Sequence, residues 1–148
     1  MTDQLVRAEY DETTGVSTVT LNTKYGVFTE KTKVHPEDTD IANRWDGIRF
    51  AWYKCLIDKM RAKAKMYETR ADGIRYALGV MRGEIKDGTY LDFGDALLEM
   101  DCILEVVEND ALRCKQIADE KEREYGKMVE GVLTTRRNLR KYKEKTEE

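Results

Sequence analysis

The chain has one proline, Pro36, and one histidine, His35, among its 148 residues. Because proline breaks helix interiors, almost nothing in the sequence prevents long uninterrupted helices. A single histidine leaves no second imidazole for a metal set, and no nucleophile lies beside it in sequence. Glycine-rich phosphate loops and Ser/His/Asp or Cys/His sets are also absent. The sequence therefore predicts no catalytic residue, no metal site and no cofactor, and it argues against an enzyme.

Long apolar runs are missing as well. No stretch approaches the ~20 apolar residues that span a bilayer, and Met1-Thr2-Asp3-Gln4 lacks the basic-then-apolar pattern of a signal peptide. The three cysteines, Cys55, Cys102 and Cys114, match no disulfide framework and no Cys-x-x-Cys metal spacing. We expect a cytoplasmic protein with no membrane contact.

Charged residues are abundant, at 37% of the chain, and their distribution is uneven. Residues 35–83 carry ten basic and seven acidic side chains, whereas residues 84–110 carry Lys86 against nine acids. This alternation predicts that a basic first helix lies beside the acidic start of a second helix. Such pairing sets the register more than it stabilises the fold, because exposed ion pairs are weak.

The chain reads as one domain over residues 1–148 that begins with a β-meander over residues 4–34. Val6, Ala8 and Tyr10 alternate with polar residues, and a turn ends at Gly15, where a positive φ is needed. A three-stranded meander of this size is not stable by itself, so we expect it to pack on one of the predicted helices.

A first helix is predicted over residues 36–82, with Pro36 at its start. Its apolar residues recur every 3.64 positions, the period of a nearly straight α-helix. Gly73 makes a bend plausible, and the pattern leaves open whether the helix continues through it. The reversal is predicted over residues 83–94. The apolar residues are Ile41, Trp45, Ile48, Trp52, Leu56, Met60, Ala64, Tyr67, Ala71, Ile74, Leu78 and Met81.

The second helix, predicted over residues 95–143, carries a heptad repeat with steps of three and four, which is typical of a coiled coil. Further apolar residues widen its face beyond what one neighbouring helix can cover, so the missing neighbour is most simply a second copy. The predicted fold is mainly α with a small N-terminal β-meander, built on a long antiparallel, coiled-coil-like helical hairpin that forms a homo-oligomer. The heptad positions are Leu97, Met100, Leu104, Val107, Ala111, Cys114, Ala118, Lys121, Tyr125, Met128, Val132, Thr135, Leu139 and Tyr142, and the widening residues are Leu98, Ile103, Val106, Leu112, Ile117, Val129 and Leu133.

Two groups of side chains are candidate binding sites for a ligand or partner. Trp45, Arg49 and Trp52 fall on one helical face, where Arg49 can lie over either indole. They could stack a base or grip a partner's aromatic residue, but docking of the meander on the helix is the favoured interpretation. The second group is basic and sits near the C-terminal end, where cations complement a helix dipole or could bind phosphate of a nucleic acid or nucleotide. Its members are Arg136, Arg137, Arg140 and Lys141, with Lys143 nearby.

A resemblance to a group of known proteins rests on a few short segments. They are Tyr25-Gly26-Val27-Phe28, Val34-His35-Pro36-Glu37-Asp38, Asp40 and Trp45-Asp46-Gly47. Over residues 16–65 the chain resembles small proteins of bacteriophages and prophages of Gram-positive bacteria. In these, a short β-hairpin ends in His-Pro-Glu-Asp or His-Pro-Asp-Asp before a long helix. The resemblance implies a phage gene expressed in the cytoplasm of a bacterial host, and it transfers no functional residue.

These clues favour a phage-type accessory protein that acts by stoichiometric binding, as an inhibitor of a host antiviral defence factor or by capturing its nucleotide signal. A coiled-coil scaffolding protein of virion assembly is one alternative. A nucleic-acid-binding accessory factor that uses the basic helix ends is another.

Overall fold

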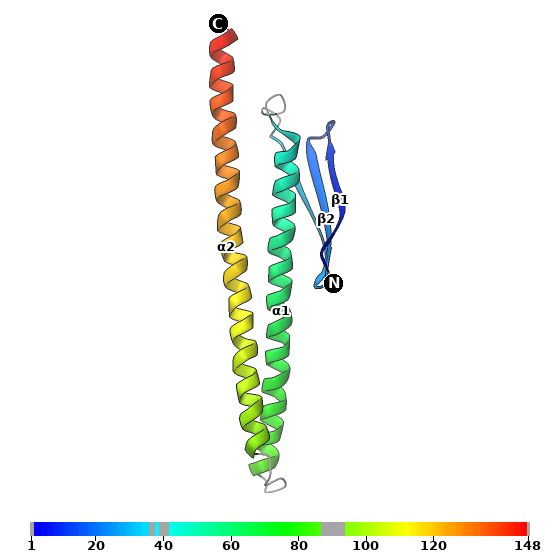
Figure 1. Ribbon diagram of the computed structural model, residues 1–148, viewed down its shortest axis with the longest axis vertical. Coiled ribbons are helices and arrows are strands. Elements are labelled where there is room, and N and C mark those ends of the chain that lie inside the picture. Colours follow the sequence, from blue (N-terminus) through cyan, green and yellow to red (C-terminus); the bar gives the residue numbers. More distant parts are fainter. Residues whose placement is uncertain (1, 36–37, 39–41, 87–93, 148) are drawn as a thin grey trace. The chain divides into compact units, whose positions relative to one another are not determined.

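The computed structural model describes residues 2–35, 38, 42–86 and 94–147. Three strands, β1 (Gln4–Asp11), β2 (Val16–Thr23) and β3 (Gly26–Lys33), precede two long helices, α1 (Arg44–Lys86) and α2 (Gly94–Glu147) (Figure 1). The strands form one antiparallel sheet in the order β1-β2-β3. The prediction of a mainly helical chain with a small N-terminal meander is confirmed.

Each helix contributes to two compact units. One unit contains Met1–Lys59 and Ala118–Glu148, and we call it the sheet unit. The other contains Met60–Ile117, and we call it the hairpin unit. Among the described residues, neither helix includes a stretch long and apolar enough to cross a membrane.

Tight turns set the register of the sheet. Gly15 has a φ of +71°, as expected for the turn between β1 and β2, and Gly26 follows the second turn with a φ of +139°. β2 is the central strand, so Ser17, Val19 and Leu21 are completely buried. β1 is an edge strand whose register shifts between Leu5 and Arg7. The alternation of apolar and polar residues predicted for β1 is not matched by alternating burial, because Val6 and Ala8 are exposed like their polar neighbours.

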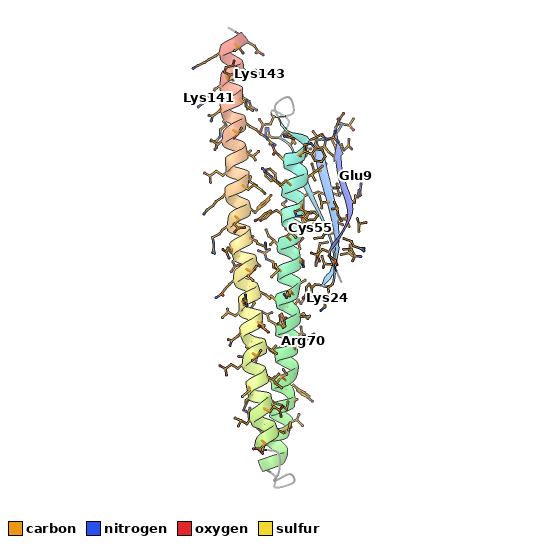
Figure 2. All side chains as sticks on the ribbon, viewed as in Figure 1. Glu9, Lys24, Cys55, Arg70, Lys141 and Lys143 are labelled. Carbon is orange, nitrogen blue, oxygen red and sulfur yellow. The ribbon has the colours of Figure 1, made fainter. Side chains whose placement is uncertain are left out.

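A hydrophobic core joins the sheet to the first half of α1. Val19 and Leu21 of β2 form a buried cluster with Ala51 and Cys55 of α1, and Phe28, Ile48, Trp52 and Leu56 pack against it. Cys55 lies on the side of α1 that faces the sheet (Figure 2), and its thiol donates to the carbonyl oxygens of Val19 and Phe28 at 3.6 Å and 3.5 Å. Because β2 has this helix over one face, the small meander has the support that it needs.

The helix boundaries differ from those predicted. α1 begins at Arg44, where Asn43 accepts from the backbone N–H groups of Trp45 (through Oδ1, 2.9 Å) and Asp46 (through its carbonyl, 3.0 Å). Asparagine is a favoured N-cap, and these contacts place the first turn of α1 directly after Asn43. The start predicted at Pro36 lies outside the described residues. α1 runs without interruption through Gly73, and most of the reversal predicted over 83–94 also lies outside the described residues.

The hairpin unit pairs the two helices in antiparallel fashion through small side chains. Ala64, Ala71 and Leu78 of α1 and Ala111 and Cys114 of α2 are buried there. Ion pairs flank this contact and join basic residues of α1 to acids of α2, as the charge pattern predicted. They are Arg75–Glu108 (2.8 Å), Arg82–Asp101 (2.9 Å) and, with the signs reversed, Glu68–Lys115.

The predicted heptad face of α2 is buried or half-buried from Leu97 to Val132. Its last three positions, Thr135, Leu139 and Tyr142, are exposed. The physical reason lies in α1, which begins at Arg44, so that Asp46 near its start is level with Arg136. Beyond that level, α1 supplies no described side chain to cover the last two turns of the pattern.

Candidate functional site

Three arginines and a histidine surround a hollow of about 290 Å³ in the sheet unit. Arg136, Arg137 and Arg140 come from α2, where a spacing of three and four residues places them on one face. His35 and Asp38 come from the segment between β3 and α1. We call this site the arginine hollow; among the described residues its lining is His35, Asp38, Leu133, Arg136, Arg137 and Arg140.

Arg136 is the most unusual member of the arginine hollow, because only 7% of its surface is exposed. Its Nη2 lies 3.7 Å from Oδ2 of Asp46, which is too long for a hydrogen bond. Its buried Nε has no hydrogen-bond partner. A buried guanidinium normally has its donors satisfied, so this side chain has capacity left for an acceptor.

The other two arginines have different environments. Arg140 forms an ion pair with Asp38. Arg137 is exposed and contacts its own helix, with Nε 3.4 Å from the carbonyl of Leu133 and Nη2 3.3 Å from the hydroxyl of Thr134. One carboxylate, that of Asp38, therefore lines the hollow beside three guanidinium groups in the part of the chain that the structure describes.

The structure brings together three of the four basic residues predicted from the sequence. Lys141 does not line the hollow; Figure 2 shows it with Lys143 on the last turns of α2. The helix continues to Glu147, so Arg136 lies well before the last turn. Because the effect of the helix dipole is confined to the last turn, it does not account for Arg136.

The aromatic group predicted around Trp45, Arg49 and Trp52 is divided between different environments. Trp52 packs against the core beneath the sheet, as the packing interpretation predicted. Trp45 is 64% exposed, and the guanidinium over its ring, 5.5 Å from the centroid, belongs to Arg44. Arg49 instead lies over the ring of Phe50 and 3.6 Å from Asp46.

Sequence reasoning missed an aromatic contact between α1 and α2 in the sheet unit. Tyr125 packs edge-on against Phe50 and stacks on Tyr53, with centroids 6.1 Å and 6.4 Å apart. The Tyr53 hydroxyl donates to Glu124, and this hydrogen bond, followed by burial and the glutamate charge, raises the pKa of Tyr53. Burial, followed by the charge of Glu30, raises the pKa of Tyr125. The signal was present at Tyr125, a predicted heptad position, but its α1 partners were not in the predicted apolar pattern.

These tyrosines make stability depend on alkaline pH. Their folded-state pKa values lie above the ordinary value of 10.0, so the folded chain holds these protons more tightly than the unfolded chain. The contribution of these two tyrosines to stability should be constant well below pH 10 and should be lost progressively as pH rises from there through their folded-state pKa values, in addition to the loss from Cys55, whose pKa is raised from 9.0 to about 11. Tyr53→Phe should make the stability fall less steeply at alkaline pH. At neutral pH it should lower the free energy of unfolding by no more than about 1 kcal/mol, because the contact with Glu124 is exposed. Urea unfolding at several alkaline pH values measures this. If the free energy of unfolding fell equally steeply with pH in Tyr53→Phe and in the wild type, Tyr53 would not contribute to the pH dependence.

Chemically, the arginine hollow is suited to holding an anion. Among the described residues, no three histidine, cysteine or carboxylate side chains are grouped so that they could hold a metal ion. In comparisons with known proteins, no family model, no curated protein and no solved structure matches the chain.

Proposed function

We propose that this protein is a phage-type accessory protein that acts by stoichiometric binding rather than catalysis, and that it works as a homo-oligomer. The observation that carries the proposal is a group of exposed apolar side chains on the first half of α2. We call this group the α2 apolar patch; its members are Leu98, Ile103, Val106 and Leu112, each between 47% and 65% exposed. Leu112 also lines a hollow beside Arg75 and Glu108.

The α2 apolar patch lies in an acidic surface, which limits the partners that fit it. Residues 94–112 carry six acidic side chains and no basic one, and two of these acids, Asp101 and Glu108, pair with arginines of α1. A complementary partner therefore presents apolar side chains among basic residues. Scattered exposed leucines are common on any surface, but four within five turns in a segment of one charge sign favour an interface.

A second copy of α2 supplies such a partner. Residues 131–145 carry six basic and one acidic side chain, and Leu133, Leu139 and Tyr142 are exposed among them. Pairing of residues 94–112 of one copy with residues 131–145 of another brings an acidic segment beside a basic one and covers exposed apolar side chains on both.

We expect light scattering to show a closed dimer or small oligomer for the wild type. Leu98→Glu combined with Leu112→Glu should lower the molecular mass to that of one chain while leaving helical circular dichroism unchanged, because both side chains are exposed. Val80→Glu on α1 is the matched control, since Val80 is also an exposed apolar helix residue. A wild type that stays monomeric at high protein concentration would remove the self-association proposal. A large open assembly would instead favour virion scaffolding.

The proposed biological role is inhibition of a host antiviral defence factor in the bacterial cytoplasm, either by binding the factor or by capturing its nucleotide signal. It is supported by the resemblance over residues 16–65 and by the arginine hollow, whose guanidinium groups suit phosphate. Nucleic-acid binding is less favoured, because Asp38 and Asp46 lie against two of the three arginines. Affinity purification from expressing host bacteria tests the role. If virion proteins alone were recovered, the proposed role would change from inhibition of a defence factor to virion assembly.

A further inference from the structure

The arginine hollow combines an excess of positive charge with an unfilled donor. Its described lining has three guanidinium groups and the single carboxylate of Asp38. Arg140 is paired with that carboxylate and Arg136 lies 3.7 Å from the carboxylate of Asp46, so among the described residues Arg137 is the guanidinium of this group that forms no ion pair. A concave site with an excess of arginine attracts an anion.

Arg136 supplies the second and independent observation. The side chain is more than nine-tenths buried, its Nε has no partner, and its contact with Asp46 is 3.7 Å long. A buried donor without an acceptor is unfavourable, and an acceptor from outside the chain relieves it.

We propose that the arginine hollow binds the phosphate group of a small phosphate monoester. Guanidinium groups pair with phosphate oxygens through two parallel hydrogen bonds, and arginines on one helix face offer several such donors to one group. The volume of about 290 Å³ is at the lower limit of ligand pockets. It therefore suits one phosphate with the adjoining part of its ester. This inference deepens the ligand-capturing form of the proposed function.

Each arginine has a distinct role in this site. Arg136, the buried member, binds phosphate oxygens and exchanges its long contact with Asp46 for a short one to the ligand. Arg137 closes the site from the exposed side and gives up its weak contacts with Leu133 and Thr134. Arg140 remains paired with Asp38 and adds charge.

Titration with inorganic phosphate, followed by calorimetry and by thermal unfolding, tests the site. We expect saturable binding and a rise in Tm that sodium chloride of equal ionic strength does not reproduce. Arg137→Gln is the main variant, because Arg137 is exposed and its loss leaves the fold intact; it should weaken phosphate binding about tenfold or more. Arg136→Lys keeps the charge but loses the planar fork, and it should weaken binding to a similar extent.

Two control variants separate this hollow from nearby positive charge. They are Lys141→Gln and Lys127→Gln. Lys141 is not among the described residues that line the hollow, and Lys127 lines the neighbouring hollow, to which Arg136 also contributes. Both variants should bind phosphate as the wild type does. Equal losses in the controls and in Arg137→Gln would overturn the assignment, as would a Tm rise that matches that with sodium chloride.

A last comparison distinguishes this site from self-association. Acidic residues of a second copy compete for the same arginines, so phosphate is also titrated into the Leu98→Glu and Leu112→Glu double variant. Binding by the variant at least as tight as by the wild type supports the site, whatever the oligomeric state. Binding by neither protein overturns the site and leaves the self-association proposal standing. A nucleoside 5′-monophosphate should bind at least as tightly as phosphate, whereas a strong preference for single-stranded oligonucleotides would replace this inference with nucleic-acid binding.

Discussion

Cys55, which is buried, is expected to react with thiol reagents on the order of a hundredfold more slowly in the folded chain than in the unfolded chain, and much more slowly than the exposed Cys102 at low protein concentration. Burial raises the pKa of Cys55 from 9.0 to about 11, and the nearby charges of Asp58 and Glu30 add to this effect. Only the thiolate form of cysteine reacts. The rise in pKa from 9.0 to about 11 lowers the thiolate fraction of Cys55 about a hundredfold near neutral pH. Burial beneath β2 and β3 slows the reaction further, because the reagent needs a local opening.

Iodoacetamide labelling followed by peptide mass mapping measures the two rates directly. Cys102→Ser should remove the fast phase, and all three cysteines should react at similar rates in concentrated urea. Cys55 labelling as fast as that of Cys102 would show that the sheet does not cover α1. The same measurement reports on self-association, because Leu98 and Val106 are four residues from Cys102 on either side along α2. Labelling of Cys102 should therefore slow as protein concentration rises.

Replacing Gly47 by alanine is expected to destabilise the chain by about 1–3 kcal/mol through overpacking, despite the better helix propensity of alanine. A Cβ at Gly47 would lie 2.3 Å from Oγ and 3.1 Å from Cβ of Ser17 on β2. Ser17 is completely buried, and the Thr32 hydroxyl donates to the Gly47 carbonyl at 2.7 Å, so neither strand can move away freely.

The matched control is Gly73→Ala on the same helix. No atom lies within 4 Å of a Cβ there, so alanine should stabilise the chain by about 0.5–1 kcal/mol. Urea unfolding at one fixed protein concentration compares the two variants. Adding Ser17→Ala to Gly47→Ala removes the shortest contact and the unpartnered Oγ of Ser17, and it should restore much of the stability. A Gly47→Ala variant as stable as Gly73→Ala would show that the sheet does not approach α1 this closely.

Periodicity predicted the architecture well, because the signals that determine it are local. The turn at Gly15 and the spacing of Ala64, Ala71 and Leu78 each depend on backbone geometry that a short window of sequence carries. α1 begins at Arg44 behind the N-cap at Asn43, a signal that the sequence analysis did not use, and the start predicted at Pro36 lies outside the described residues. The close approach of Ser17 to Gly47 depends on tertiary packing between β2 and α1, so only the structure shows it.

The candidate site was predicted only in part. The spacing of Arg136, Arg137 and Arg140 placed them on one helix face, and that placement is local. The contributions of His35 and Asp38, about one hundred positions earlier in the chain, depend on tertiary packing that no sequence window contains. Burial of Arg136 is likewise unpredictable from sequence, because arginine is ordinarily a surface residue.

The irregular edge of the sheet has a consequence for how copies of this protein meet. An extended strand with unpaired backbone groups invites addition of a foreign strand, which leads to polymers. On β1 the ladder is interrupted between Leu5 and Arg7, and the Arg7–Glu9 ion pair places both charges on that edge. The outermost strand is thus a poor template, and growth into fibrils through it is disfavoured.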